Sequence, residues 1–198
     1  PNTNVIHTTS GSGVLTLSKP AIATSVGGSY TFISDTATLI TANVNGLDSL
    51  TGSVIVTGNK SFQAGTNYVF NGETTKPFGI SSGSGNASIF AGSVDVNASI
   101  TVNRNFSVYR RLGINAKITL RPLDTLFVLA GGVINGNYNS TNYIVTDYNS
   151  TTGAQSVVQY DGLSTSVTLP IGTVNYFLPV TLSPTTVSSF TAAAFLGI

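Results

Sequence analysis

Two stretches of the chain alternate apolar and polar residues with a period of two, and this alternation is the tightest constraint on the fold. In residues 93–103 and 111–121 every even-numbered residue is apolar, and the residues between them are polar or Gly. Successive side chains of a β-strand point to opposite faces, so the alternation predicts strands with one buried and one solvated face. No window of a dozen residues has the spacing of an amphipathic helix, and we predict an all-β chain.

The two parts of the chain differ in how their strand-like runs are spaced. Up to residue 134, short motifs such as Ser53–Thr57 and Ser93–Asn97 recur loosely, which predicts a β-solenoid-like or sandwich-like region over residues 1–134. Residues 135–198 carry five strand-like runs with turns at short, even spacing, which predicts a small antiparallel β-sandwich. The polar run 135–142 separates the two predicted domains.

The composition favours a structural protein over an enzyme. Only 8% of the residues are charged, against about 25% in an ordinary domain, and catalysis depends mainly on ionisable side chains. Hydrophobic residues make up 41% of the chain, enough to build a core. We therefore predict no enzymatic activity, no cofactor and no metal.

Charge and hydropathy also limit the partners. The net charge is +1 and Cys is absent, so we expect no nucleic-acid partner and no disulfide framework. No apolar run approaches the roughly 18 to 20 residues that span a bilayer, so we expect no membrane insertion. The chain begins at Pro1 and holds no Met, so we expect a processed product or a segment of a longer protein.

Four segments of the second part form a pattern: Thr141–Thr146, Gln159–Tyr160, Ser166–Gly172 and Tyr176–Leu182. The pattern resembles a β-rich module of large cell-surface adhesin and filament proteins of Bacteroidetes that are secreted by the type IX pathway. In that module Phe is usual where this chain has Leu169. The resemblance implies an extracellular location on a bacterial cell surface, a structural or adhesive role, and no catalytic residues.

Three Asp-Ser/Thr-aliphatic triplets are similar to the O-glycosylation signal of that phylum, and they make Thr36, Ser49 and Thr125 candidate O-glycosylation sites. The alternative is that each Asp caps a turn before a strand. The chain also holds six Asn-x-Ser/Thr sequons, at Asn59, Asn86, Asn97, Asn105, Asn139 and Asn149.

A basic cluster gathers five of the eight positive charges within 18 residues: Arg104, Arg110, Arg111, Lys117 and Arg121. Aromatic residues are interleaved with them, as in surfaces that bind anionic polymers, so the cluster is a candidate patch for an anionic partner. The alternatives are a solvated sheet face whose charges discourage edge-to-edge pairing, or a contact with an acidic partner subunit.

Other chemical candidates are weaker. His7 has no Cys or carboxylate near it in the sequence. Asp35, Asp48 and Glu73 would need to converge to act as glycosidase carboxylates, and Asn43, Asn45 and Asp48 are the best local oxygen cluster for calcium. A sugar-stacking aromatic platform would use Tyr30, Tyr68, Tyr138, Tyr143, Tyr148 and Tyr176.

Together these features predict a non-enzymatic extracellular structural or adhesive protein, a self-assembling subunit or repeat module of a bacterial surface fibre. Its expected partners are further copies of itself and glycans. The alternative is a surface-displayed carbohydrate-binding module. A polysaccharide-active β-helix enzyme and a viral capsid or fibre domain are further alternatives.

Overall fold

The computed structural model describes most of the chain between residues 37 and 160, together with strands on either side. The described residues are 4–8, 14–17, 22–23, 29–33, 37–47, 51–55, 60–62, 64–78, 89–102, 104–129, 131–137, 139, 141–160, 166–173, 180–182 and 189–194. These residues form strands and turns, and none of them lies in a helix.

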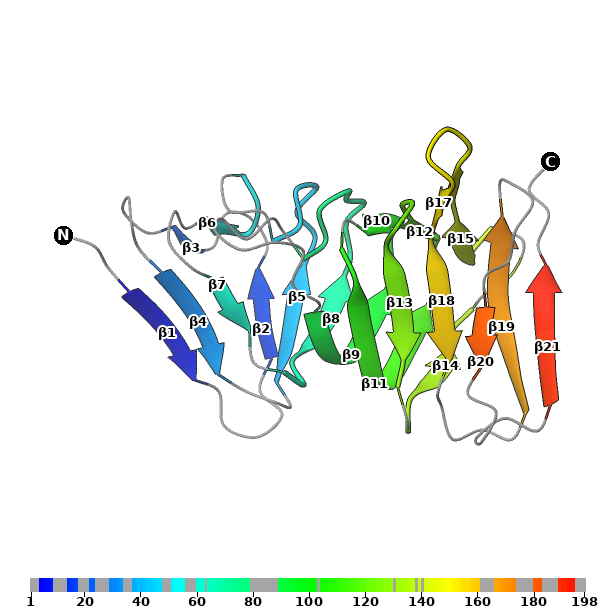
Figure 1. The fold of residues 1–198 in the computed structure, drawn as a ribbon. Helices are drawn as coiled ribbons and strands as arrows, with labels where there is room; N and C mark the ends of the chain where they lie inside the picture. The colour runs from blue at the N-terminus through cyan, green and yellow to red at the C-terminus, as the bar shows by residue number, and fades with distance from the viewer. Residues whose placement is uncertain are drawn as a thin grey trace.

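A nine-stranded sheet, here called the main sheet, is the largest sheet of the described residues, and every strand pair in it is parallel (Figure 1). In spatial order it contains β2 (Val14–Leu17), β5 (Thr38–Thr41), β8 (Asn67–Phe70), β9 (Ile89–Val96), β11 (Phe106–Ile114), β13 (Thr125–Val128), β18 (Val157–Tyr160) and β20 (Val180–Leu182), and β14 (Val133–Asn135) also pairs with β11.

A second sheet of five parallel strands contains β10 (Ile100–Val102), β12 (Ile118–Leu120), β15 (Ile144–Thr146), β19 (Ser166–Thr173) and β21 (Ser189–Ala194). Towards the N-terminus there are two smaller parallel sheets, one of β1 (Asn4–Thr8), β4 (Ser29–Ile33) and β7 (Lys60–Phe62), and one of β3 (Ile22–Ala23) and β6 (Val54–Ile55). Among the described strands, only β16 (Tyr148–Asn149) and β17 (Ala154–Gln155) pair antiparallel, in a projecting hairpin.

The strands of the two larger sheets alternate along the chain, since β9, β11 and β13 belong to the main sheet and β10 and β12 to the second. Two parallel neighbours need a long crossover between them, and here that crossover is itself a strand of the other sheet. The inward side chains of both sheets form one apolar core. Members of that core include Leu39, Tyr68, Phe70, Val94, Val96, Ile100, Val102, Phe106, Leu112, Ile114, Ile118, Leu120, Leu126, Ile144, Val158 and Tyr160.

The fold class expected from the sequence, a β-solenoid-like or sandwich-like first part followed by a small antiparallel β-sandwich, is wrong. The main sheet is parallel, and the strands after residue 135 join the same two parallel sheets as those before it. Alternation reports which residues face inward and carries no information on strand direction. The division into residues 1–134 and 135–198 stays a prediction, although both sheets run across that position.

Each of the two long alternating runs is two strands and not one. Residues 93–103 contain the end of β9 and all of β10, and residues 111–121 contain the end of β11 and all of β12. The alternation continues through the corner between the sheets, and the predicted inward residues Val94, Ile100 and Ile118 are fully or almost fully buried. A corner between two sheets therefore looks like an uninterrupted strand in the sequence.

A strained turn precedes β13. The Asp124 N–H donates to the Arg121 carbonyl at 3.0 Å, and Leu123, at the third position of this turn, has φ 74°. That left-handed conformation is unfavourable for a side chain with a Cβ, and Asn and Gly adopt it most easily. Leu123 is also 74% exposed, so its side chain contributes little packing.

We predict that Leu123→Asn raises the free energy of unfolding by about 1 kcal/mol, because it relieves the left-handed strain without removing buried apolar surface. Urea denaturation of the two proteins measures the difference. Leu123→Ala is the matched control, since Ala lacks the short polar side chain that makes the left-handed conformation accessible to Asn and should give no such gain. Equal stability of the Asn variant and the wild type would contradict the strained turn.

Candidate functional site

A row of asparagines crosses four neighbouring strands of the main sheet, one or two residues after each strand ends. The Asn97 side-chain amide donates to Asn71 Oδ1 at 2.9 Å, and the Asn115 amide donates to Asn97 Oδ1 at 2.9 Å. Asn115 Oδ1 in turn accepts the backbone N–H of Asn137 at 3.0 Å. An amide donates and accepts at once, so each layer can bond to the next in the same way. We call these four residues the asparagine row.

A groove of about 370 Å³ lies at the edge of the second sheet, and most of the residues that line it are polar. Four successive layers of the chain contribute to it: the turn after β5, the segment after β8, β10 with the residue before it, and β12. Its lining consists of Val44, Asn45, Glu73, Thr74, Thr75, Ser99, Ile100, Thr101 and Thr119. We call it the hydroxyl groove.

Backbone hydrogen bonds fix the floor and one wall of the hydroxyl groove. Thr74 donates its N–H to the Ser99 carbonyl at 3.1 Å and accepts the Thr101 N–H at 2.8 Å. In the wall, Gly46 has φ 52°, and a Cβ there would stand 2.2 Å from the Lys76 carbonyl oxygen. Only Gly can make this close approach, so the wall is held against the next layer.

Three threonines stand in register on the floor of the groove. Thr101 pairs with Thr119, and Thr75 stands beside Thr101 because the preceding residue, Thr74, bridges Ile100. Neighbouring strands are about 4.8 Å apart, so the hydroxyls form a regular row. Within the part of the chain that the structure describes, these three hydroxyls make no hydrogen bond to protein.

The groove carries one charged lining residue among those described, the exposed Glu73. Lys117 directly precedes β12, in the layer next to Ser99. Its ammonium sits over the Tyr143 ring, 5.6 Å from the centroid, and it does not line the groove. The groove is therefore a hydroxyl-rich surface of weak negative charge.

The structure distributes the predicted basic cluster among internal contacts. Arg104 is 7% exposed; burial lowers its pKa from the ordinary arginine value, and the Asp124 carboxylate opposes that shift. The same carboxylate binds Arg121 Nε at 3.0 Å. Arg104 and Arg121 thus both interact with one buried acid.

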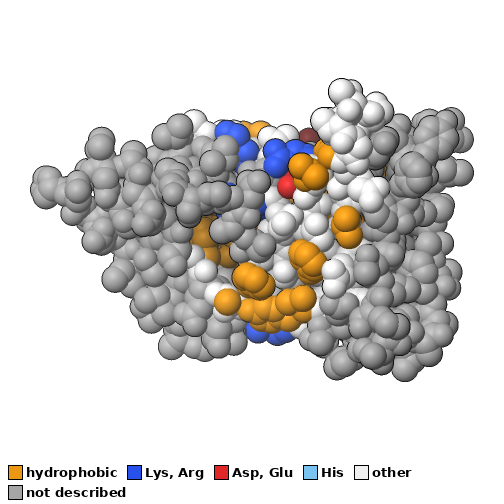
Figure 2. Space-filling model, viewed as in Figure 1, with side chains coloured by type: hydrophobic (Ala, Val, Ile, Leu, Met, Phe, Trp, Pro, Cys, Tyr) orange, Lys and Arg blue, Asp and Glu red, His pale blue; other side chains and the backbone are white. Residues whose placement is uncertain are grey.

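The other three cations also contact the protein. Arg111 forms an ion pair with Asp95 on the neighbouring strand, and Lys117 makes the aromatic contact described above. Arg110 belongs to a bulge of β11. Its guanidinium lies across Gly92, so a Cβ at position 92 would stand 1.7 Å from Arg110 Nη2. The same guanidinium donates to the Gly65 carbonyl and to Asn67 Oδ1. Figure 2 accordingly shows basic side chains at separate places on this face, with an acidic side chain beside one group.

The candidate glycosylation residues are found in different settings. Thr125 is half-buried at the start of β13, directly after the turn that Asp124 closes, and its N–H donates to Asn105 Oδ1 at 2.7 Å. Of the sequons, Asn97 belongs to the asparagine row, whereas Asn139 and Asn149 are exposed and accept bonds from nearby backbone N–H groups. Glycosylation stays a prediction at all of them.

Several other candidates lie outside the described side chains: Thr36, Ser49, His7, Asp35, Asp48, Asn59, Asn86, Tyr30, Tyr138, Tyr148 and Tyr176. Two members of the predicted aromatic platform are described, and both are buried: Tyr68 is 2% exposed and Tyr143 is 7% exposed. These two rings pack inside the protein and offer no stacking surface. Among the described residues no three His, Cys, Asp or Glu side chains are placed to hold a metal ion.

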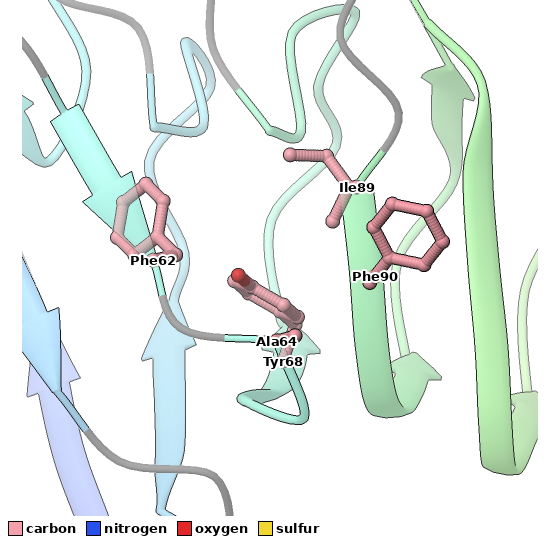
Figure 3. A pocket seen from close by; sticks show the side chains of 5 residues that line it. All are labelled: Phe62, Ala64, Tyr68, Ile89 and Phe90. Carbon is pink, nitrogen blue, oxygen red and sulfur yellow. The ribbon is translucent and has the colours of Figure 1, made fainter.

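A smaller apolar hollow of about 100 Å³ lies between Phe62, Tyr68, Ile89 and Phe90 (Figure 3). Tyr68 also packs edge-on against Phe62, with ring centroids 6.1 Å apart. The hollow belongs to the packing between layers and offers few polar groups to orient a ligand.

No protein-family model, no curated protein and no solved structure matches this chain. Among the described residues, no helix is both long enough and apolar enough to cross a membrane.

Sequence reasoning missed both the asparagine row and the hydroxyl groove. A signal for the row was present, because Asn71, Asn97 and Asn115 each follow an apolar strand residue and precede Gly or Ala. The groove had no comparable signal, since its residues lie in four separate segments that only the strand register brings together.

We predict that the bonds of the asparagine row stabilise the stack measurably. Asn97→Ala should lower the free energy of unfolding by about 1 kcal/mol, because it removes two neutral hydrogen bonds at an exposed position. A double-mutant cycle with Asn115→Ala, followed by urea denaturation, should give a coupling energy of about 0.5 kcal/mol or more. Strict additivity of the two substitutions would show that the contact contributes nothing.

We also predict weak binding to anionic polymers, because the five cations of the basic cluster already face internal partners. The protein should leave a sulfated-polysaccharide column below about 0.15 M salt, where exposed charges are only partly screened. The variant Asp95→Asn, which releases Arg111, should elute at higher salt. Strong retention of the wild type would instead support the anionic-partner patch.

Proposed function

We propose that this chain is a non-enzymatic structural or adhesive module of a bacterial cell surface, and that copies of it associate end to end. The observation that carries the proposal is the unbroken parallel pairing from β2 to β20, with an apolar core that follows it from layer to layer. A stack of strands paired in this way transmits mechanical force through the main-chain hydrogen bonds between all of its layers.

The described acids support a non-catalytic role. Asp95 and Asp124 are engaged with arginines, and Glu73 is the one acid that lines the hydroxyl groove. Hydrolysis of a glycoside by the usual route needs two carboxyl groups about 5 to 10 Å apart across one cleft. The described part of the chain supplies no such pair in the groove.

The ends of the sheets supply the association surface. Among the described strands, β20 pairs only with β18, β21 only with β19, and β2 only with β5. A sheet edge offers unpaired N–H and C=O groups that another strand can occupy. Joining the free edge of β20 or β21 in one copy to a strand at the N-terminal end of the next copy continues the parallel pairing from copy to copy. Such a head-to-tail contact produces an open fibre.

We predict that the purified protein forms filaments whose length grows with protein concentration, as seen by electron microscopy and sedimentation. Thr191→Pro and Ala192→Pro form a matched pair in β21, because alternate N–H groups of a strand point to opposite neighbours. The substitution at the residue whose N–H bonds to β19 should lower the unfolding temperature, because it breaks that pairing. The substitution at the residue whose N–H points away from β19 should keep the wild-type unfolding temperature and shorten the filaments. Discrete monomers at every concentration would overturn self-assembly.

A further inference from the structure

We propose that the hydroxyl groove binds a glycan chain that lacks acidic groups, made of neutral or amino sugars. This site goes beyond the structural role above and uses none of the tyrosines expected to stack on sugars. It stands on the groove's own geometry, and it does not require the end-to-end association of copies.

The hydrogen-bonding groups of the groove match those of a sugar. A Thr hydroxyl donates one hydrogen bond and accepts others, as a sugar hydroxyl does. The hydroxyls of Thr75, Thr101 and Thr119 have no partner among the described residues and stand in register in adjacent layers. They are already ordered by the sheet, so a ligand gains their hydrogen bonds with little loss of side-chain entropy.

The wall of the groove supplies the apolar contact that the faces of sugar rings need. Val44 is 67% exposed and stands in the lining. The turn that carries it is held by the Gly46 N–H bond to the Asn43 carbonyl at 2.8 Å and by the Leu47 N–H bond to the Pro77 carbonyl at 3.2 Å. An isolated exposed Val needs no explanation, but a Val fixed beside a row of hydroxyls gives the mixed lining typical of small-ligand sites.

The charge of the groove selects against acidic sugars. The Glu73 carboxylate accepts hydrogen bonds from hydroxyl or ammonium groups and repels a uronate or a sulfate. Among the described residues the lining of the groove includes no cation: Lys76, next to Thr75 in the chain, is not part of the lining, and Lys117 is held over Tyr143. An anionic polymer therefore lacks a counter-charge here.

The size of the groove indicates an oligosaccharide segment. The hydroxyl row spans three layers, or about 10 Å at the ordinary strand spacing. The groove volume of about 370 Å³ lies within the range of small-ligand sites.

Isothermal titration calorimetry with soluble cello-, chito- and chitosan-oligosaccharides tests the proposal, with oligogalacturonate as the acidic comparison. We expect binding of at least one of the first three and at least tenfold weaker binding of the acidic chain. Thr101→Val and Thr119→Val keep the β-branched shape and should each weaken binding about three- to tenfold, the worth of one neutral hydrogen bond.

Two further variants sharpen the test. Glu73→Gln should reduce the discrimination against oligogalacturonate, because it removes the repelling charge. Thr38→Val, on the outward side of β5 in the main sheet, should leave affinity unchanged. Absence of binding by all three non-acidic chains would overturn the proposal, and so would equal affinity for the acidic chain. The same holds if neither Thr101→Val nor Thr119→Val changes the affinity. The titrations are made at a protein concentration where sedimentation shows a single species, so that self-assembly of the protein does not affect the measured affinity.

Discussion

The register between adjacent layers is the constraint on which the rest of the structure depends. Val94 stands between Tyr68 and Leu112 on the two neighbouring strands, and all three are buried. Each layer must present an apolar side chain at this height, because a shift of one residue would turn the whole inward set of a strand to solvent. The same register brings the asparagine row and the groove threonines into line, so the surface features are consequences of core packing.

The constraint fixes the strands and leaves the connections free. The paired residues Val94 and Leu112 are 18 positions apart in the chain, whereas Leu126 and Val158 are 32 apart. The longer layer accommodates the β16–β17 hairpin, which projects from the stack (Figure 1). Because extra residues in a surface connection cost little free energy, layers of unequal length can share one register.

This freedom explains what the sequence could and could not predict. Burial of Val96, Leu112 and Ile114 followed from alternation alone, and the strands Ile144–Thr146 and Val157–Tyr160 lie where apolar runs were found. Strand direction did not follow, because hairpins and corners use the same Gly, Asn and Asp residues. The groove was unpredictable for the same reason, since its members meet only after the register of four layers is known.

In-register stacking also accounts for the scarcity of charge. Side chains at equivalent outward positions of neighbouring layers are about 5 Å apart, and like charges in such a row destabilise it. Asn and Thr avoid this cost because they donate and accept, and the asparagine row from Asn71 to Asn137 shows a row that bonds to itself. Part of the charge that does occur in the stack is opposed, as in the Asp95–Arg111 pair between β9 and β11. A chain of this composition is therefore suited to extending one layered structure without accumulating electrostatic repulsion along it.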